Sequence, residues 1–193
     1  NLDFDTVIDR THTNSLKYDF AVQRGKPKDV LPLWVADMDF QVSSYIQEAL
    51  SGSVAHGIFG YSEAEGSYFE AVAGWMSRHY GWNVEETWLV KTPGIVFALA
   101  QAVRAFTDPG DAVLLQQPVY YPFSQVIRDN GRKIVDNTLV QGEDGRYRID
   151  FTDFEEKIRS AHVKLFFLCN PHNPVGRVWT KEELLRLGDI CER

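Results

Sequence analysis

The chain has 193 residues, of which 44% are apolar and 24% are charged, a composition close to that of average globular proteins. Its net charge is −7 and it has no basic run, which argues against nucleic acid or an anionic membrane surface as a partner. No apolar run approaches the ~20 residues that a membrane-spanning helix needs, and two cysteines, too few for a disulfide framework, favour a cytoplasmic protein.

The amino-terminal residues 1–30 are polar and mixed in charge, which predicts an irregular arm. The apolar run that follows, residues 31–36 (LPLWVA), predicts a short strand ending at Asp37 and Asp39. Two carboxylates at this spacing could hold a metal ion or act as an acid–base pair, or they could simply cap a turn. We favour the turn, because no histidine lies near them.

Two helices are predicted in the next stretch. Residues 44–50 favour a short helix, and apolar residues at helical spacing predict an amphipathic helix over residues 67–80, ended by Gly81. Between them, residues 52–57 (GSVAHG) have the outer glycine spacing of a P-loop but lack the Lys and Ser/Thr that must follow, so we reject a nucleotide site. Tyr61, in a glycine-flanked aromatic loop, could pack or contact a ligand.

Strands and helices then alternate regularly, which predicts an α/β fold with a mostly parallel sheet. Strands are predicted at residues 88–90, 112–115, 133–135 and 165–169. Helices are predicted at residues 95–106, around residues 123–129, at residues 151–160 with Asp150 or Thr152 as cap, and after a Thr180–Glu183 capping box. The last strand (LFFLC) is apolar throughout, as expected for a strand that is buried on both faces.

Three strand-to-helix turns carry candidate binding residues. Gly94 opens a helix whose first backbone N–H groups are unpaired, so this turn could hold a phosphate or be an ordinary connection. Tyr120 and Tyr121 lie between two prolines, where an aromatic ring could stack on a planar ligand or pack in the core. In residues 170–176 (NPHNPVG) two prolines stiffen a turn that places the amide of Asn173.

Because ligands bind at the carboxyl edge of open α/β sheets, these three turns together predict one site for a phosphorylated, planar, hydrogen-bonding ligand. Residues 170–176 resemble the N-P-x-N-P-[TV]-G motif of fold-type I pyridoxal phosphate enzymes, the aminotransferase class I/II group. Residues 118–120 (PVY) resemble its P-x-Y motif. Residues 34–40 (WVADMDF) and 173–179 (NPVGRVW) are similar to the cystathionine β-lyase-like carbon–sulfur lyases within that group.

The resemblance implies a three-layer αβα sandwich with a mostly parallel sheet, the incomplete large domain of a pyridoxal phosphate transferase, and an N-terminal arm belonging to the small domain. We expect the arm and part of the small domain in residues 1–50 and the truncated large domain in residues 51–193. The resemblance also implies that the cofactor is pyridoxal 5'-phosphate, that the substrate is a small amino acid, and that the protein is a homodimer.

Residue roles follow from the same resemblance. The backbone amides of Gly94, Ile95 and Val96 would hold the cofactor phosphate. The ring of Tyr120 would stack on the pyridine, and Asn173 would donate to its phenolic oxygen. Three further residues would lie near the substrate, with one of them reaching the neighbouring subunit's site: Ala36, Tyr121 and, across the dimer interface, Tyr61. No metal ligand is implied.

The resemblance covers only the first half of the family's length. The lysine that forms the Schiff base with the cofactor is expected after Arg193, so this chain holds no catalytic residue and we expect it to be inactive alone. For the whole protein it implies β-elimination from cystathionine or cysteine conjugates, giving a thiol, pyruvate and ammonia. A class I/II aminotransferase is the alternative, since both share the first steps.

Two other classes stay open. A nucleotide-dependent oxidoreductase is compatible with the βαβ alternation, although no G-x-G-x-x-G sequence follows any strand. A non-catalytic relative, such as the pyridoxal-dependent domain of a regulator, would carry an amino-terminal DNA-binding segment, and none is visible in these residues.

Overall fold

The computed structural model describes residues 3–193, which form two units that divide between Ala71 and Val72. Each unit is described by itself. The first consists of irregular segments, a short 3-10 helix at Val22–Arg24, helix α1 at Ser44–His56 and the first residues of helix α2 (Gly66–Tyr80), within which the division falls. The domain division after residue 50 stays a prediction.

The strand expected at residues 31–36 is wrong, because these residues have no regular secondary structure. Pro32 lacks the N–H group that a strand pairing uses, and Val35 has a φ of 66°, in the left-handed region that β-branched residues rarely adopt. The segment is therefore a bent, irregular connection.

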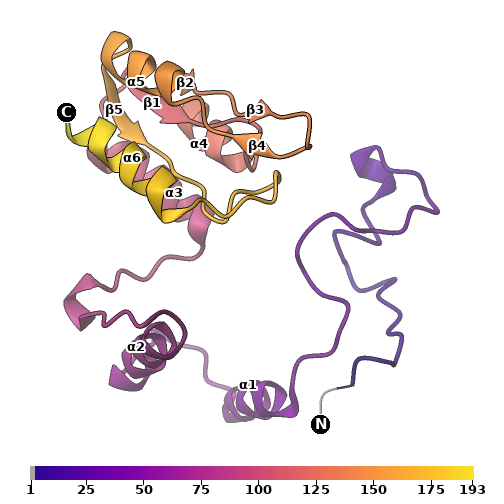
Figure 1. The fold of residues 1–193 in the computed structure, drawn as a ribbon. Coiled ribbons are helices and arrows are strands. Elements are labelled where there is room, and N and C mark those ends of the chain that lie inside the picture. The colour runs from indigo at the N-terminus through magenta and orange to yellow at the C-terminus, as the bar shows by residue number, and fades with distance from the viewer. Residues whose placement is uncertain (1–2) are drawn as a thin grey trace. The chain divides into compact units, whose positions relative to one another are not determined.

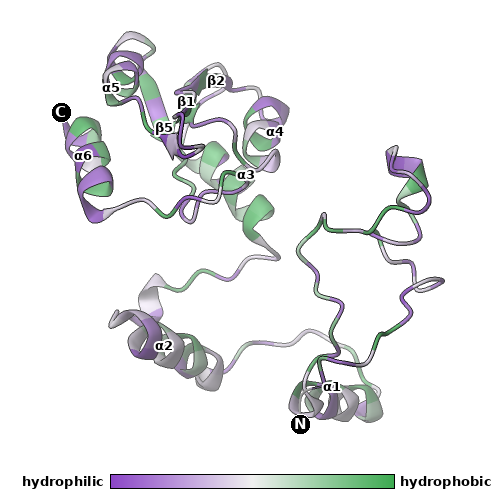
Figure 2. Ribbon diagram, turned by 45° about the vertical axis from the view of Figure 1, so that its right-hand side comes forward, coloured by the Kyte–Doolittle hydropathy of each residue, from purple (hydrophilic) through white to green (hydrophobic). Residues whose placement is uncertain are grey.

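The two helices predicted before residue 81 are confirmed. Helix α1 is longer than expected and includes most of the glycine-containing 52–57 segment, and Gly57 ends it with a φ of 74°. Helix α2, Gly66–Tyr80, ends at Gly81, whose φ is 63°. Neither helix has a buried residue, although Figure 2 shows apolar stretches on both.

The second unit contains a parallel sheet, as predicted (Figure 1). Its strands β1 (Ala112–Leu115), β2 (Lys133–Asp136) and β5 (Val163–Phe166) lie in the order β2-β1-β5. The central strand β1 pairs in parallel with both neighbours and is fully buried, which explains its continuous apolar sequence.

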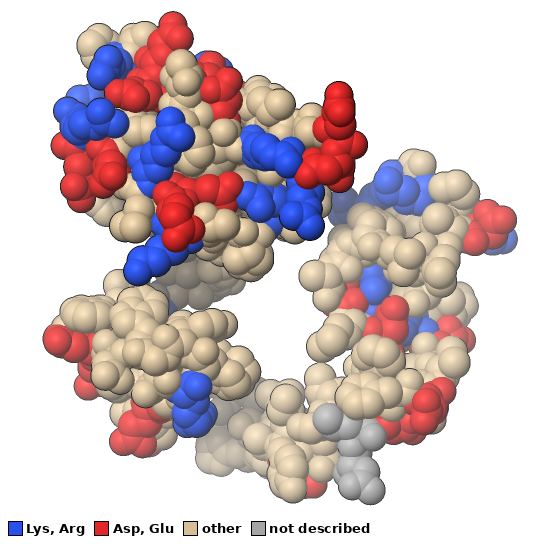
Figure 3. Space-filling view, viewed as in Figure 1, with Lys and Arg blue, Asp and Glu red and all other residues tan. Residues whose placement is uncertain are grey.

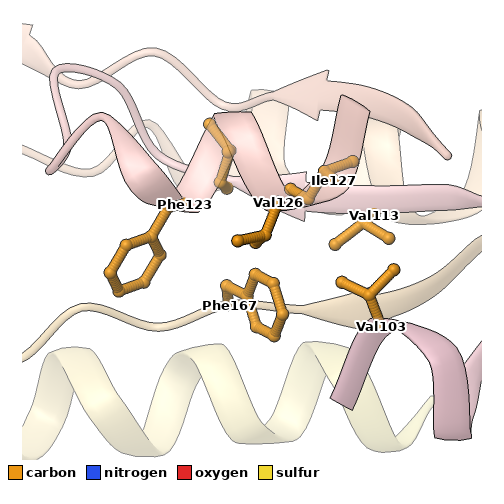
Figure 4. Close-up of a cluster of buried hydrophobic side chains, with 7 residues drawn as sticks. Val103, Val113, Phe123, Val126, Ile127 and Phe167 are labelled. Atoms are coloured by element: carbon orange, nitrogen blue, oxygen red, sulfur yellow. The ribbon is translucent and has the colours of Figure 1, made fainter. Parts of the chain in front are cut away.

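Helices cover both faces of the sheet, so the predicted three-layer αβα architecture is confirmed. The side chains of Val113 and Leu115 point to one face, where they pack with residues of α3 (Ile95–Phe106) and α4 (Pro122–Asp129) (Figure 4). Leu114 points to the other face, where α5 (Phe151–Ser160) and α6 (Lys181–Glu192) complete a second cluster. This alternation is what period-2 strand geometry requires.

Two strand predictions need correction. Residues 88–90 do not form a strand: a 3-10 helix at Glu86–Trp88 is followed by extended but unpaired residues. A strand needs a hydrogen-bonded neighbour, and no described strand lies beside this segment. The strand predicted at 165–169 runs from Val163 to Phe166 and is only half-buried, because β5 is an edge strand in the described sheet.

One β-hairpin was not predicted. Strands β3 (Val140–Gln141) and β4 (Tyr147–Arg148) form an antiparallel hairpin. The turn contains Asp144 followed by Gly145, which has a φ of 76°. An Asp-Gly pair between two short runs is the sequence signal that would have indicated it.

Asp150 caps α5, and its replacement tests this cap. The Asp150 carboxylate accepts hydrogen bonds from the N–H groups of Thr152 and Asp153, each at 3.0 Å. We expect Asp150→Ala to lower the free energy of unfolding by about 1 kcal/mol, measured by urea unfolding followed by circular dichroism. Asp150→Asn keeps an acceptor and should stay within a few tenths of a kcal/mol of the parent. Equal losses in both variants would contradict the cap.

None of the helices in residues 3–193 is both long and apolar enough to cross a membrane. On the face shown in Figure 3, basic and acidic side chains are interspersed over the second unit, and no single-sign surface stands out there.

Candidate functional site at the carboxyl edge of the sheet

The orientation of α3 places its first turn at the carboxyl edge of the sheet. Its last turn is fixed at the opposite, amino edge: the Arg132 guanidinium, just before β2, donates to the Thr107 hydroxyl at 2.9 Å and to the Thr107 carbonyl. Nearby, the Gly110 N–H donates to the Gly131 carbonyl at 2.8 Å. A helix of 12 residues is longer than the four-residue strand β1. Since the last turn of α3 lies at the amino edge, Gly94 lies toward the carboxyl ends of the strands.

The turn at Gly94 leaves the end of α3 open. Gly94 has φ 144° and ψ 165°, a conformation that other residues rarely adopt, and no atom lies within 4 Å of where a Cβ would be. The first helical hydrogen bond runs from the Ala98 N–H to the Gly94 carbonyl at 3.1 Å. The N–H groups of Ile95 and Val96 therefore precede the helical ladder and face an uncovered helix end, which suits an anion.

A buried amide network supports the end of β1. The Gln116 side chain donates to the Asn137 side chain at 2.9 Å, and Asn137 in turn donates to the Asp153 carboxylate at 2.7 Å. The Gln117 N–H donates to the Asp136 carboxylate at 2.9 Å. These bonds tie the backbone immediately before the Tyr120 turn to the end of β2 and the residue that follows it, although the Gln116 Oε1 atom is buried without a partner in the described residues.

Tyr120 and Tyr121 follow this support and lie at the surface. Tyr120 is 41% exposed and Tyr121 is 68% exposed, and their rings meet edge to face with centroids 5.3 Å apart. The alternative that Tyr120 is a core aromatic does not hold in this chain. Its exposed surface could accept a stacked planar group.

Asn173 lies in the turn that follows β5. Its backbone N–H donates to the Cys169 sulfur at 3.5 Å, and within residues 3–193 its side chain has no hydrogen-bond partner. The turn is closed by a β-bridge between His172 and Arg177, whose backbone N–H···O distance is 2.6 Å. The Asn173 amide is thus free to bind a ligand from a rigid turn.

Trp179 anchors the same turn to the sheet and to α6. Its indole N–H donates to the Cys169 carbonyl at 3.0 Å, and its backbone N–H donates to the Asn170 side chain at 3.1 Å. The Arg177 guanidinium lies over the indole, 4.6 Å from the ring centroid, and pairs with Glu183 of the capping box at 2.5 Å. Sequence reasoning identified the capping box but did not connect it to the Asn173 turn.

His172 is the titratable residue that sequence reasoning missed at this edge. It is 1% exposed, and burial lowers its pKa, opposed by nearby backbone carbonyls of Pro118, Gln116 and Cys169. The ring is therefore held neutral at ordinary pH. Its position inside the proline motif was the only sequence signal.

Ala36 and Tyr61 belong to the first unit, in which Tyr61 is fully exposed. Beside Ala36, Asp37 and Asp39 pair with Arg10 at 2.6 and 2.5 Å, and the Lys17 ammonium donates to the Asp37 carbonyl at 2.7 Å. Hydrogen bonds from Arg10 lower the pKa of both carboxyl groups. This pairing supports a structural role for the two aspartates.

Residues 28–193 match the family described as aminotransferase class I and II. A curated relative, cystathionine beta-lyase PatB of Bacillus subtilis (strain 168), is 47% identical over 190 residues, covering 98% of this chain and 49% of the relative. The chain therefore spans about half the length of the curated relatives it matches.

Solved structures agree with this match. A putative aminotransferase from Clostridium difficile 630, bound to its PLP cofactor, superposes with a TM-score of 0.93 at 40% identity, covering 100% of this chain and 49% of that chain. Cystalysin from Treponema denticola, which contains a pyridoxal 5'-phosphate cofactor, superposes with a TM-score of 0.89 at 39% identity, covering 97% of this chain and 48% of that chain.

Proposed function

This chain belongs to the aminotransferase class I and II family, and from that membership we propose that it is the cofactor-holding half of a pyridoxal phosphate-dependent carbon–sulfur β-lyase. The observation that carries the proposal is the set of three ligand-ready turns at one edge of the sheet. The 47% identity to a cystathionine beta-lyase supports elimination over transamination as the reaction of the whole protein.

The open end of α3 fits the cofactor's phosphate. A dianionic phosphate next to the N–H groups of Gly94, Ile95 and Val96 would complete the hydrogen bonds that the helix leaves unmade and would be stabilised by the helix dipole. The empty space in front of Gly94 leaves room for it.

The other two turns fit the cofactor's ring. The half-exposed ring of Tyr120 offers a stacking surface for a pyridine, and the unpaired side-chain amide of Asn173 can donate to a ring oxygen. Such a donor stabilises negative charge on that oxygen and so helps to set the acidity of the bound cofactor. Tyr121, which contacts Tyr120 edge to face, would lie on the substrate side.

When bound, pyridoxal phosphate supplies an electron sink for the pair of electrons left when a substrate loses its α-proton. The residues of this chain would bind and orient the cofactor. The lysine that would accept the α-proton lies outside these 193 residues. We therefore propose that this chain alone performs no turnover.

Four further points belong to the proposal. The whole protein would be a homodimer in which Tyr61, exposed in its own unit, reaches the neighbouring site, and backbone near Ala36 would contact the substrate carboxylate. Residues 1–50 would belong to a small domain and residues 51–193 to the large domain. The cytoplasm would be its compartment, since Cys169 and Cys191 are both free thiols.

Incubating the full-length protein with cystathionine and pyridoxal phosphate tests the reaction. We expect pyruvate and thiol in equal amounts without any added 2-oxo acid, because elimination regenerates the cofactor in each turnover. Pyruvate is measured by coupling to lactate dehydrogenase and thiol by a chromogenic disulfide. Apoprotein and the 193-residue chain serve as controls and should give background rates.

Strict dependence on a 2-oxo acid would contradict the lyase proposal and favour the aminotransferase alternative. Turnover by the 193-residue chain alone would contradict the proposal that this chain only holds the cofactor and that the catalytic lysine lies outside it.

A further inference from the structure

The buried ring of His172 connects two turns that are far apart in sequence. Its Nε2 atom lies 3.0 Å from the Pro118 carbonyl oxygen, across 54 residues of chain. A carbonyl oxygen can only accept a hydrogen bond, so Nε2 carries the proton and donates it. Pro118 lies two residues before Tyr120, and His172 directly precedes Asn173.

The His172 ring cannot reorient freely. The Trp179 indole packs against it edge to face, with centroids 5.4 Å apart and an interplanar angle of 83°. Its backbone is held on both sides, since the N–H donates to the Arg177 carbonyl at 2.6 Å and the carbonyl accepts from the Gly176 N–H at 2.9 Å. Nδ1 is buried without a hydrogen bond in the described residues, which suits a bare lone pair better than a second N–H.

This bond lies beyond the point where the strand pairing ends. The last ladder bond between these two strands runs from the Phe167 N–H to the Leu114 carbonyl at 2.9 Å. Beyond it, no further backbone hydrogen bond pairs these two segments in residues 3–193. There the bond from His172 to Pro118 is the hydrogen bond that joins the two turns directly. Without it, only apolar packing such as the edge-to-face contact of Phe123 with Phe167 joins the two turns, and such packing is less directional than a hydrogen bond.

We propose that His172 is a positioning residue whose Nε2–H bond to the Pro118 carbonyl fixes the Tyr120 ring relative to the Asn173 amide. A planar cofactor stacked on Tyr120 is then presented to Asn173 in one geometry. The proposal rests on the proposed function, because it assigns the Tyr120 turn to a face of the pyridine ring and the Asn173 turn to the oxygen at the edge of the same ring.

Two substitutions of matched length test the role of the donor in the full-length protein. In Gln the side-chain NH2 occupies the place of the imidazole Nε2, whereas in Met a methyl group does. We expect His172→Met to raise the dissociation constant of pyridoxal phosphate about tenfold and to shift the visible absorption band and its pH midpoint, because both report the ring's contacts with Tyr120 and Asn173. His172→Gln should restore both to within about threefold of the parent.

Parent-like affinity and spectrum in His172→Met would overturn the inference, as would equal losses in the two variants. If His172→Met does not fold, nitrogen NMR of the parent still decides: a neutral ring protonated at Nε2 supports the inference, and a ring protonated at Nδ1 overturns it. A parent protein that binds no pyridoxal phosphate would instead overturn the proposed function itself, a separate result.

Discussion

Replacing Gly94 with valine is expected to weaken pyridoxal phosphate binding by about 10- to 100-fold in the full-length protein. A β-branched residue cannot adopt a φ of 144° without strain, so the backbone must rotate and carry the N–H groups of Ile95 and Val96 away from the phosphate. The added side chain also enters the open space where the phosphate would lie. Titrating apoprotein with the cofactor, followed by its visible absorbance, measures the effect.

Gly110 provides a matched control for backbone strain. It also has a positive φ, 91°, and no atom within 4 Å of a Cβ position, but it lies at the amino edge of the sheet, next to Gly131. We expect Gly110→Val to lower thermal stability and to leave cofactor affinity unchanged. Equal affinities in the two valine variants would show that the turn at Gly94 does not hold the phosphate.

Replacing Phe154 with alanine is expected to lower the free energy of unfolding by about 3–5 kcal/mol. Phe154 is 0% exposed and lies at the centre of the cluster between the sheet and helices α5 and α6. Its ring meets that of Phe166 edge to face, with centroids 5.0 Å apart. Removing it leaves a cavity that well-packed neighbours cannot fill, and urea unfolding followed by circular dichroism measures the cost.

Phe154→Leu is the control for this prediction, because it keeps most of the volume and should cost less than about 1.5 kcal/mol. A loss below 1 kcal/mol for the alanine variant would mean that the cluster collapses around the gap. The site turns lie at the strand ends, so the folded fraction of both variants should bind pyridoxal phosphate with the parent's affinity.

Helix positions in this chain could be predicted from the sequence because their signals are local. Apolar spacing and end residues placed α2, α3 and α5, and the Thr180–Glu183 capping box is present as expected. The strands predicted at residues 31–36 and 88–90 are absent because strand formation is not local. An apolar run specifies a possible strand, but a strand exists only beside a hydrogen-bonded partner.

The candidate site, too, could be predicted from the sequence only where its signals are local. The order of elements predicted that Gly94, Tyr120 and Asn173 follow strands and share one edge. Tyr120 and Asn173 do follow strands β1 and β5, whereas Gly94 follows an unpaired segment and lies toward the same edge through the orientation of α3. The roles of those residues stay predictions. Whether Tyr120 is exposed, and how its turn is held, could not be read from spacing, since both depend on packing across the sheet.

By itself, then, the sequence determined where the turns with candidate binding residues lie, because prolines, glycines and strand ends act within a few residues of chain. Only the tertiary structure decided what holds those turns in place. Long-range contacts of the same kind recur elsewhere in the chain: Arg10 pairs with Asp37 and Asp39, which are 27 and 29 residues away, and His172 bonds to Pro118 across 54 residues. Such contacts are set by how strands and loops pack, and no local pattern encodes which distant partner a buried ring or a guanidinium will meet.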